Sequence, residues 1–324
     1  MINIIGGGVA GLTVGAELTR RGEKVTIFDP KGSPGPHHCS WWAGGMLAPH
    51  CESESADPEV VTYGLSAAAW WKGFTSVVEA GSLVVSNPRD RADLNRFERL
   101  TREHQRMDRS AIENLEPDLA GRFADALYFP TEAHLSPRQA LADLRAYLSK
   151  NGALFVDAEA PPGLDAVVDC RGLGARDQLR DLRGVKGEML MIRSGELNFQ
   201  RPIRFLHPRI PLYLVPRGEG VYMLGATMIE NNSLRTITAR SLLEMLSSAY
   251  AIHPAFGEAE ILETGVDFRP AFLDNLPRVN RKADRYSVNG LFRHGYLLAP
   301  ALACQLADWL LNDIKGGLCA DDQY

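Results

Sequence analysis

The alternation of apolar and polar residues at the N-terminus predicts a strand, a helix and a second strand in close succession. The apolar run Ile2–Ile5 predicts a short buried strand, and a helix is expected from about Val9 to Arg21. Gly22 ends that helix, and Val25–Phe28 is a second apolar run. A strand, a helix and a strand in this order predict the opening unit of an α/β fold.

The turn between the first strand and the helix has glycines at the spacing of a dinucleotide-binding loop. Gly6 makes the tight turn, Gly8 lets the backbone approach a pyrophosphate, and Gly11 lets the helix pack closely on the strand. Asp29 ends the second strand, where a carboxylate accepts hydrogen bonds from the hydroxyls of an adenosine ribose and repels a 2′-phosphate. A plain structural turn has the same glycine spacing, but the complete context favours a dinucleotide. These residues alone do not separate FAD from NAD.

The middle of the chain continues with helices and strands and contains a highly charged stretch. The charges at 89–109 are most simply the solvated face of a helix. Ser136 caps and Pro137 starts a helix that Gly152 ends. The other elements expected before residue 170 are a helical region at 58–80 and strands at 83–86, 126–129, 154–156 and 166–169, of which the last two return to the first sheet.

The character of the sequence changes at Gly187, where strand-forming residues and turn signals indicate an antiparallel sheet. We expect strands at 187–195, 211–220, 220–227, 259–267 and 291–292, helices at 238–250 and about 300–314, and an elbow at Arg269-Pro270. This order predicts an α/β protein of two discontinuous domains. Residues 1–80, 136–186 and 265–324 would form a Rossmann-like nucleotide domain, and 81–135 and 187–264 an antiparallel-sheet domain.

Composition and charge fit an ordinary soluble enzyme. The chain has 324 residues, of which 45% are hydrophobic and 23% charged, and its formal net charge is −5. That charge argues against nucleic acid or an anionic membrane as a partner, and no apolar run approaches the ~20 residues that span a bilayer. The first strand starts at the N-terminus, which leaves no room for a signal peptide. The cysteines are odd in number and lack CxxC spacing, so we expect neither a disulfide framework nor a metal site. A chain without disulfides fits the reducing cytoplasm, which is the compartment we expect. The cysteines are Cys39, Cys51, Cys170, Cys304 and Cys319.

A polar loop rich in glycine and proline follows the second strand, at the strand end where open α/β sheets bind ligands. Gly44, Gly45 and Met46 in this loop suggest backbone that lies against a flat ligand. Trp41 and Trp42 need a large apolar surface to cover, either as anchors of the core or in a pocket.

Four motifs relate the chain to a known family: CSWWAGGMLAP at 39–49, YLVPRGEGVYMLGAT at 213–227, DFRPAFLDNLPRV at 267–279 and LFRHGYLLAPALA at 291–303. On these motifs the chain resembles the D-amino-acid oxidase superfamily of flavoproteins, and within it most the glycine oxidases of thiamine thiazole biosynthesis. The resemblance runs from end to end and is weakest between residues 88 and 126. It implies an FAD-binding domain interleaved with a substrate domain. It also implies oxidation of glycine by hydride transfer from Cα to flavin N5, giving the imine and hydrogen peroxide.

The resemblance also implies which residues contact FAD. The N-terminus of the last helix would point at the pyrimidine end of the flavin, where it stabilises the anion that forms on reduction. The chain departs from the family at three places. The segment 157–165 is shorter than usual, and Trp41 and Trp42 replace small residues. Leu291 replaces a residue that is often polar, so it would contact the flavin only through its backbone. The implied contacts are Gly6, Gly8, Val9, Ala10, Gly11, Asp29, Pro30, Cys39, Ser40, Gly44, Gly45, Met46, Ala160, Cys170, Gly172, Leu291, Phe292, Arg293, His294, Gly295, Tyr296 and Leu297.

Substrate contacts implied by the resemblance fall on Arg269, Arg293, Tyr213 and Met228. Hydride removal needs the substrate carboxylate held so that the C–H bond points at the flavin, and a bidentate guanidinium does this well. Arg269 is the first choice for that role, with a surface arginine before a proline as the alternative. Arg293 would support the carboxylate or the reduced flavin. Tyr213 would donate to the carboxylate, or it is a packed cross-strand aromatic residue, and Met228 would form the pocket wall.

Other interpretations remain open from sequence. A sarcosine or D-amino-acid oxidase shares the fold, and an NAD-dependent dehydrogenase or a non-catalytic nucleotide-binding subunit shares the glycine turn. Molecular oxygen and a small amino acid are the expected reaction partners. His37, His38 and Cys39 are candidates for a covalent flavin link, although loop residues of this kind are usually solvated. The apolar stretches WWAGGML and AAAWWKGF favour a homo-oligomer.

Overall fold

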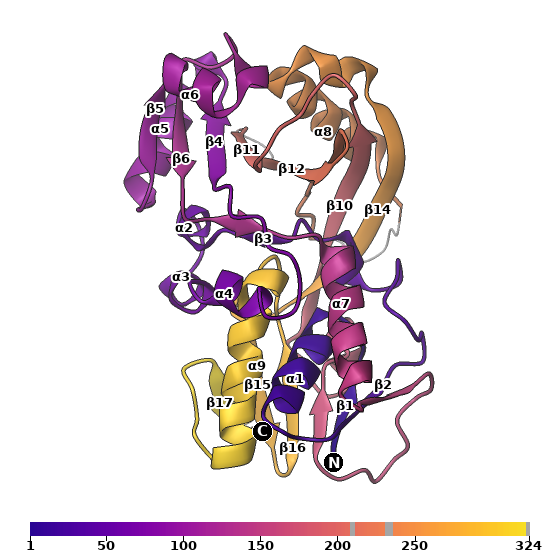
Figure 1. Ribbon diagram of the computed structural model, residues 1–324. Helices are drawn as coiled ribbons and strands as arrows, with labels where there is room; N and C mark the ends of the chain where they lie inside the picture. The colour runs from indigo at the N-terminus through magenta and orange to yellow at the C-terminus, as the bar shows by residue number, and fades with distance from the viewer. Residues whose placement is uncertain (208–210, 231–235, 322–324) are drawn as a thin grey trace.

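Two large β-sheets lie in opposite halves of the molecule, one above the other in Figure 1. The computed structural model describes residues 1–207, 211–230 and 236–321, and the two sheets belong to that part of the chain. The chain crosses between the halves several times, so each sheet combines segments that are far apart in sequence.

The lower sheet in Figure 1 contains the N-terminal strand and has the order β17-β15-β16-β9-β1-β2-β8. Its neighbouring strands are parallel except for β15 and β16. Short buried apolar runs form its centre, as expected for a parallel sheet covered by helices. The strands are β1 (Ile2–Ile5), β2 (Val25–Phe28), β8 (Leu154–Val156), β9 (Val167–Asp169), β15 (Arg278–Lys282), β16 (Arg285–Asn289) and β17 (Cys319–Asp321).

Helices α1 (Val9–Arg20), α7 (Pro137–Lys150) and α9 (Gly295–Asn312) pack on this sheet and on one another. Ser136 is the N-cap residue of α7, but its side chain makes no capping hydrogen bond. Helix α9 starts at Gly295, earlier than expected, and includes Pro300. A proline inside a helix leaves the carbonyl four residues earlier without its donor. Here Trp71 Nε1 donates to that carbonyl, the Tyr296 oxygen, at 2.7 Å.

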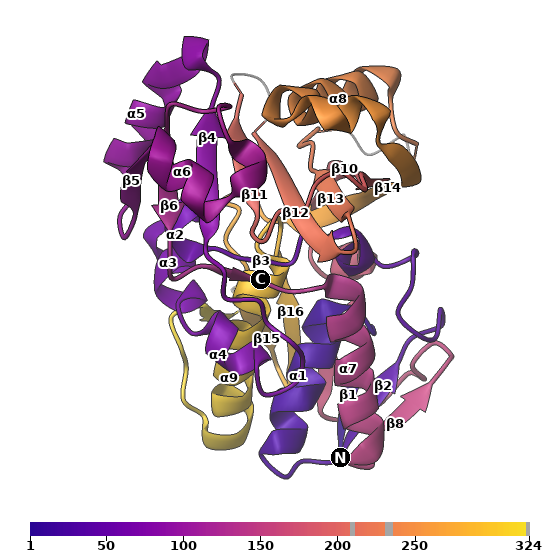
Figure 2. The same cartoon turned by 45° about the horizontal axis from the view of Figure 1, so that its top comes forward.

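The upper sheet has the order β14-β10-β13-β12-β11-β4-β6-β5. Its neighbours are antiparallel except for β4 and β11. Helix α8 (Ala239–Ile252) covers it, as Figure 2 shows, and Met245 of α8 packs into its core. The strands are β4 (Ser82–Ser86), β5 (Gln105–Asp108), β6 (Asp125–Phe129), β10 (Arg183–Arg193), β11 (Ile203–Leu206), β12 (Leu212–Gly218), β13 (Val221–Gly225) and β14 (Glu260–Ala271).

Short elements join the two halves and flank the sheets. A two-stranded ribbon of β3 (Met46–Leu47) and β7 (Ala133–His134) crosses between the halves. The helices are α2 (Pro49–Glu52), α3 (Pro58–Gly64), α4 (Ala67–Trp71), α5 (Arg91–Leu100) and α6 (Arg109–Leu115), and the 3-10 turns are η1 (Cys39–Trp42), η2 (Pro88–Asp90), η3 (Pro117–Leu119), η4 (Gly172–Asp177) and η5 (Pro254–Glu258).

Some expected elements are wrong in detail. Arg269-Pro270 is no elbow: Arg269 lies within β14, opposite Val185 of β10. Proline is tolerated there because β14 is at the edge of the sheet. Residues 291–292 form a turn after β16 rather than a strand. The charged stretch 89–109 divides between helix α5 and strand β5. The two-domain boundaries remain a prediction, and β10 and β14 each cross one of them.

Candidate active site

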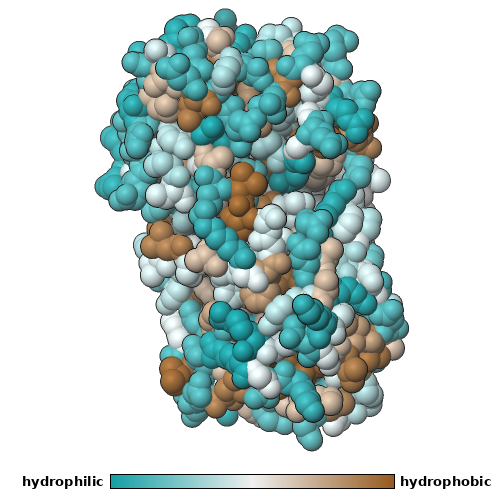
Figure 3. Space-filling view, viewed as in Figure 1, coloured by the Kyte–Doolittle hydropathy of each residue, from teal (hydrophilic) through white to brown (hydrophobic). Residues whose placement is uncertain are grey.

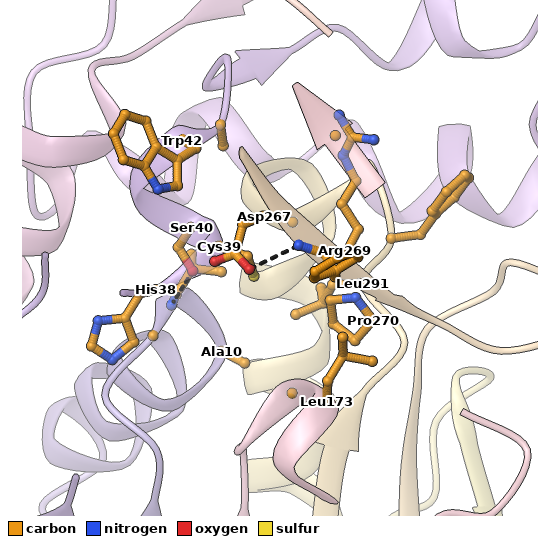
Figure 4. A pocket seen from close by; sticks show the side chains of 18 of the residues that line it. Ala10, His38, Cys39, Ser40, Trp42, Leu173, Asp267, Arg269, Pro270 and Leu291 are labelled. Atoms are coloured by element: carbon orange, nitrogen blue, oxygen red, sulfur yellow. Dashed lines mark hydrogen bonds between the residues drawn. The ribbon is translucent and has the colours of Figure 1, made fainter. Parts of the chain in front are cut away.

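A cavity of about 790 Å³ lies where the two sheets meet and is lined by residues of both. It extends from the glycine turn after β1 to Arg269 on β14 and Tyr213 on β12. Figure 4 shows Ala10 and Leu173 on one side of this pocket, Trp42 on another, and Arg269 with Asp267 between them. The cavity has the size range of small-molecule sites, which are concave and carry a few placed polar groups.

The glycine turn brings bare backbone to the cavity. Gly6 has a φ of +107°, and a Cβ there would lie 2.6 Å from the Cys170 carbonyl oxygen. A Cβ at Gly11 would overlap the Gly6 carbonyl oxygen. The side chain of Ser40 accepts a hydrogen bond from the Val9 N–H at 3.0 Å, in the first turn of α1. Glycine is therefore needed at Gly6 and Gly11, because the strand and the helix approach each other too closely there for a side chain.

Asp29 stands beside this turn and has several donors. It accepts hydrogen bonds from the N–H groups of Gly7 at 2.7 Å and Lys31 at 2.9 Å, and it lies 2.8 Å from His38 Nε2. Burial by itself raises the pKa of Asp29, but His38 and the two N–H groups outweigh it and lower the pKa to about 2. Asp29 is thus a fixed anion at the carboxyl end of β2, and His38, one of the candidates for a covalent link, is directed at it.

Most of the residues predicted to contact FAD line the cavity. They are Gly6, Gly8, Val9, Ala10, Asp29, Pro30, Cys39, Ser40, Gly44, Gly45, Met46, Cys170, Gly172, Leu291, Phe292, Arg293, Gly295 and Tyr296. Gly11, Ala160, His294 and Leu297 do not line it. Gly11 is packed against the Gly6 carbonyl, and Leu297 against Gly64. At the shortened segment, Glu159 lines the cavity in place of its neighbour Ala160.

The loop at Gly44 and Gly45 is held by an arginine that the sequence did not single out. Arg217 of β12 donates hydrogen bonds to the carbonyls of Gly44 at 2.7 Å and Leu135 at 3.2 Å. Gly45 has a φ of +68°, and a Cβ there would overlap the Leu135 carbonyl oxygen. The upper sheet therefore fixes the backbone of the loop that lines the cavity.

The two tryptophans of this loop have different surroundings. Trp42 lines the cavity, and its ring lies so close to Gly265 that a Cβ there would overlap the indole. Trp41 is outside the cavity, with the Arg138 guanidinium 4.7 Å from its ring centroid. Of the two expected locations, pocket and core, Trp42 occupies the pocket, and Trp41 packs against the core around α7.

Arg269 presents a half-buried positive charge to the cavity. Its guanidinium lies over Gly187 of β10, where a Cβ would be 2.5 Å from Cζ. Nη1 donates to the Thr227 carbonyl at 2.9 Å. Among the described residues Arg269 forms no ion pair, although Asp267 on the same strand also lines the cavity. Burial lowers the pKa of Arg269 to about 10, which still leaves it charged at neutral pH.

A buried network fixes the carbonyl that Arg269 uses. Thr227 Oγ1 donates to Glu188 Oε2 at 3.1 Å and accepts from the Glu188 N–H at 3.0 Å. Glu188 in turn pairs with Lys186 at 2.7 Å, and both charged side chains are at most 2% exposed. A fully bonded buried network of this kind is rigid. Arg269 therefore has a defined orientation before any ligand binds.

Arg293 and Tyr213 line the cavity, but both are engaged with Glu52, a residue that sequence reasoning missed. Arg293 Nη2 lies 2.8 Å from Glu52 Oε2, and the Tyr213 hydroxyl donates to Glu52 Oε1 at 3.2 Å. Arg204 donates to the Tyr213 oxygen at 2.8 Å. No local motif predicts this cluster of side chains, because Glu52 and Arg204 are far apart in sequence. Met228, 47% exposed, also lines the cavity, and its role as a wall of the substrate pocket stays a prediction.

Comparison with known proteins identifies the family. The model of the family DAO, described as FAD dependent oxidoreductase, matches residues 1–309. The chain is 50% identical over 317 residues to a putative thiamine biosynthesis oxidoreductase ThiO of Rhizobium etli, covering 96% of this chain and 97% of that protein. It is 27% identical to a glycine oxidase of Geobacillus kaustophilus, covering 95% and 92% of the two chains.

A solved structure agrees with the fold. The crystal structure of glycine oxidase from Bacillus cereus superposes with a TM-score of 0.83 at 23% identity, over 98% of each chain. The predicted fold class, the class of enzyme and the choice of FAD over NAD are confirmed. The chain belongs to the DAO family of FAD-dependent oxidoreductases.

Proposed function

We propose that the protein oxidises glycine with FAD, releases hydrogen peroxide, and supplies the imine for thiazole formation in thiamine synthesis. The observation that carries this proposal is Arg269, a half-buried cation facing the cavity without an ion-pair partner among the described residues. A cation that is partly withdrawn from water and lacks an ion pair favours a ligand of opposite sign, such as the carboxylate of an amino acid. The names of the relatives from Rhizobium etli and Geobacillus kaustophilus support the substrate and the biosynthetic role.

The residues of the cavity fit FAD. The backbone at Gly6 and Gly11 has no room for a side chain, and the first turn of α1 contains no acidic residue that would repel a pyrophosphate. Asp29 lies where it can accept the ribose hydroxyls. When bound, FAD would supply the acceptor for the hydride, and molecular oxygen would be the final electron acceptor.

The protein's own residues bind and orient the substrate. Arg269 would hold the substrate carboxylate through two parallel charge-assisted hydrogen bonds. Trp42 and Met228 border the same cavity and would limit the entry of water. Gly295, the first residue of α9, lines the cavity, so the partial positive charge of the helix N-terminus faces it. We propose that Arg293, whose charge is balanced by Glu52, helps to shape this end of the pocket, and that Tyr213 closes the pocket indirectly, through Glu52.

The test is to purify the protein, record its visible flavin spectrum and measure peroxide release with glycine, sarcosine and D-alanine. We expect a yellow protein with the highest kcat/KM for glycine. A higher value for sarcosine or D-alanine would show the alternative oxidase activity. A yellow protein that releases no peroxide with any of the three would contradict an amino-acid oxidase.

We further propose that the protein self-associates and works in the cytoplasm. Trp71, one of the tryptophans that suggested association, is fully buried inside the chain and is not available for an interface. Support comes instead from apolar side chains on the surface, which include Leu273 at 76% and Leu243 at 66% exposure. The face in Figure 3 is mostly hydrophilic with separate apolar patches. The five cysteines are free, and no helix among the described residues has the length and hydropathy to cross a membrane. A monomeric mass in solution at micromolar concentration would contradict self-association.

A further inference from the structure

Glu52 is the carboxylate at the charged end of the cavity. It is the last residue of α2, only 8% exposed, and lines the cavity together with Arg204 and Arg293. Its Oε2 atom is 2.8 Å from Arg293, and its Oε1 atom is 3.9 Å from Arg204. Burial raises the pKa of Glu52, but Arg293, His294 and Arg204 outweigh it and lower the pKa. Glu52 is therefore an anion at neutral pH.

The three arginines near this end differ in how their charges are compensated. Arg293 pairs with Glu52, and Arg204 pairs with both Glu52 and Glu54. Arg269 has no such partner among the described residues. Arg293 is close enough to Arg269 that, after burial, its charge contributes to the lowered pKa of Arg269. With Glu52 in place, Arg269 is the one of these three guanidiniums that has no ion pair within the described part of the chain and is left for an anionic ligand.

We propose that Glu52 restricts the substrate to amino acids with a single carboxylate, by neutralising Arg293 and repelling a second anionic group. This inference rests on the proposed function, because it specifies which amino acids the same site accepts as substrates. Specificity of this kind comes from an element that opposes the wrong ligand as well as from contacts with the right one.

Removing the charge of Glu52 should reverse the preference. Arg293, whose side chain is 20% exposed, would then lose its carboxylate partner, and an unpaired charge in a cavity is costly. A ligand with two carboxylates would then compensate Arg269 and Arg293 together. A ligand with one carboxylate would gain little, because Arg269 already binds it in the parent protein.

The experiment titrates the FAD-loaded protein with acetate and with malonate, and follows the visible flavin spectrum. Acetate has one carboxylate and malonate has two, and neither is a substrate. In the parent we expect acetate to bind at least as tightly as malonate. In Glu52→Gln, malonate affinity should rise about tenfold, the size of one added charge-assisted hydrogen bond, while acetate affinity changes less than about threefold.

Two variants control for indirect effects. Glu54→Gln also removes a carboxylate that pairs with Arg204, at 3.4 Å, but Glu54 does not line the cavity. Its ratio of malonate to acetate affinity should equal that of the parent. In the double variant Glu52→Gln/Arg293→Met the gain for malonate should disappear, because the freed guanidinium is gone.

The outcomes separate this proposal from the proposed function. Unchanged malonate affinity in Glu52→Gln, or the same gain in Glu54→Gln, would overturn it. If Glu52→Gln does not retain FAD, the parent still decides, because malonate binding tighter than acetate would contradict a single-carboxylate site. A parent that prefers acetate yet releases no peroxide from glycine would refute glycine oxidation and leave the charge rule standing.

Discussion

The two ends of the cavity are built by different means. At the Gly6–Gly11 end, backbone lies so close that added Cβ atoms would collide with carbonyl oxygens. At the Arg269 end, charged side chains from separate strands and helices form ion pairs with one another, and Arg269, without an ion pair among the described residues, donates to a backbone carbonyl. The first end is therefore sensitive to volume, and the second to charge and hydrogen bonding. Substitutions that change one property at a time can test this difference.

The largest effect is expected from Gly11→Ala. The new Cβ would overlap the Gly6 carbonyl oxygen, so α1 must move from β1. We expect loss of FAD binding and destabilisation at or above the upper end of the ~1–3 kcal/mol typical of overpacking. Urea unfolding of the apoprotein and FAD titration measure both. Gly195→Ala is the control, because Gly195 has open space around it and, like Gly11, no positive φ; normal FAD binding in Gly11→Ala would contradict the close packing.

Asp29→Asn should have the next largest effect, and it should depend on pH. The folded-state pKa of Asp29 is lowered from 3.8 to about 2, so the charged form contributes about 2 kcal/mol of stability above pH 4. This contribution is lost as the pH falls from 4 to 2. The difference in apoprotein stability between parent and Asp29→Asn should therefore be larger at pH 7 than at pH 2.5. An equal difference at both pH values would show that the carboxylate charge is not stabilised by its donors.

Thr227→Val tests the support of Arg269 at the other end. The change keeps shape but removes the hydroxyl that donates to Glu188, which should cost about 1–3 kcal/mol of stability. We also expect acetate affinity to fall about three- to tenfold, because the Thr227 carbonyl that orients Arg269 is less fixed. Thr13→Val is the matched control, since Thr13 is a buried threonine bonded within α1. Equal loss of acetate affinity in both variants would mean that the effect is global.

The smallest effect is expected from Tyr213→Phe. The Tyr213 hydroxyl donates to Glu52, so its removal should change acetate affinity less than about threefold and cost about 1 kcal/mol of stability. This differs from the expectation that Tyr213 donates to the substrate. A tenfold or greater loss of acetate affinity, measured by flavin titration, would restore that expectation.

The same contrast explains what the sequence predicts. The nucleotide end is encoded within the first 29 residues, where strand, turn and helix follow local rules, and the expected strand and helix bounds there agree with β1, α1 and β2 to within one residue. The charged end joins Glu52, Arg204, Tyr213 and Arg293 through long-range packing. No local spacing predicts that the Tyr213 hydroxyl donates its hydrogen bond to Glu52. Arg217 was missed for the same reason, since its partners are backbone carbonyls of distant loops.

Errors in the elements around the site also have long-range causes. The proline at 270 suggested a break, but the edge position of β14 removes the need for its N–H. Pro300 suggested a helix start, but Trp71 satisfies the carbonyl that the proline leaves free, and α9 begins five residues earlier at Gly295. In both cases a partner distant in sequence overrides the local signal.

The central claim is that Arg269 binds the substrate carboxylate, and acetate titration of three variants tests it most directly. Arg269→Met removes the charge, Arg269→Lys keeps the charge without the planar fork, and Arg293→Met removes the arginine that is already paired. We expect acetate affinity to fall at least about 100-fold in Arg269→Met, equivalent to about 3 kcal/mol, with little recovery in Arg269→Lys and less than about tenfold loss in Arg293→Met. Parent-like acetate binding by a yellow, folded Arg269→Met protein, with the large loss in Arg293→Met instead, would contradict the claim.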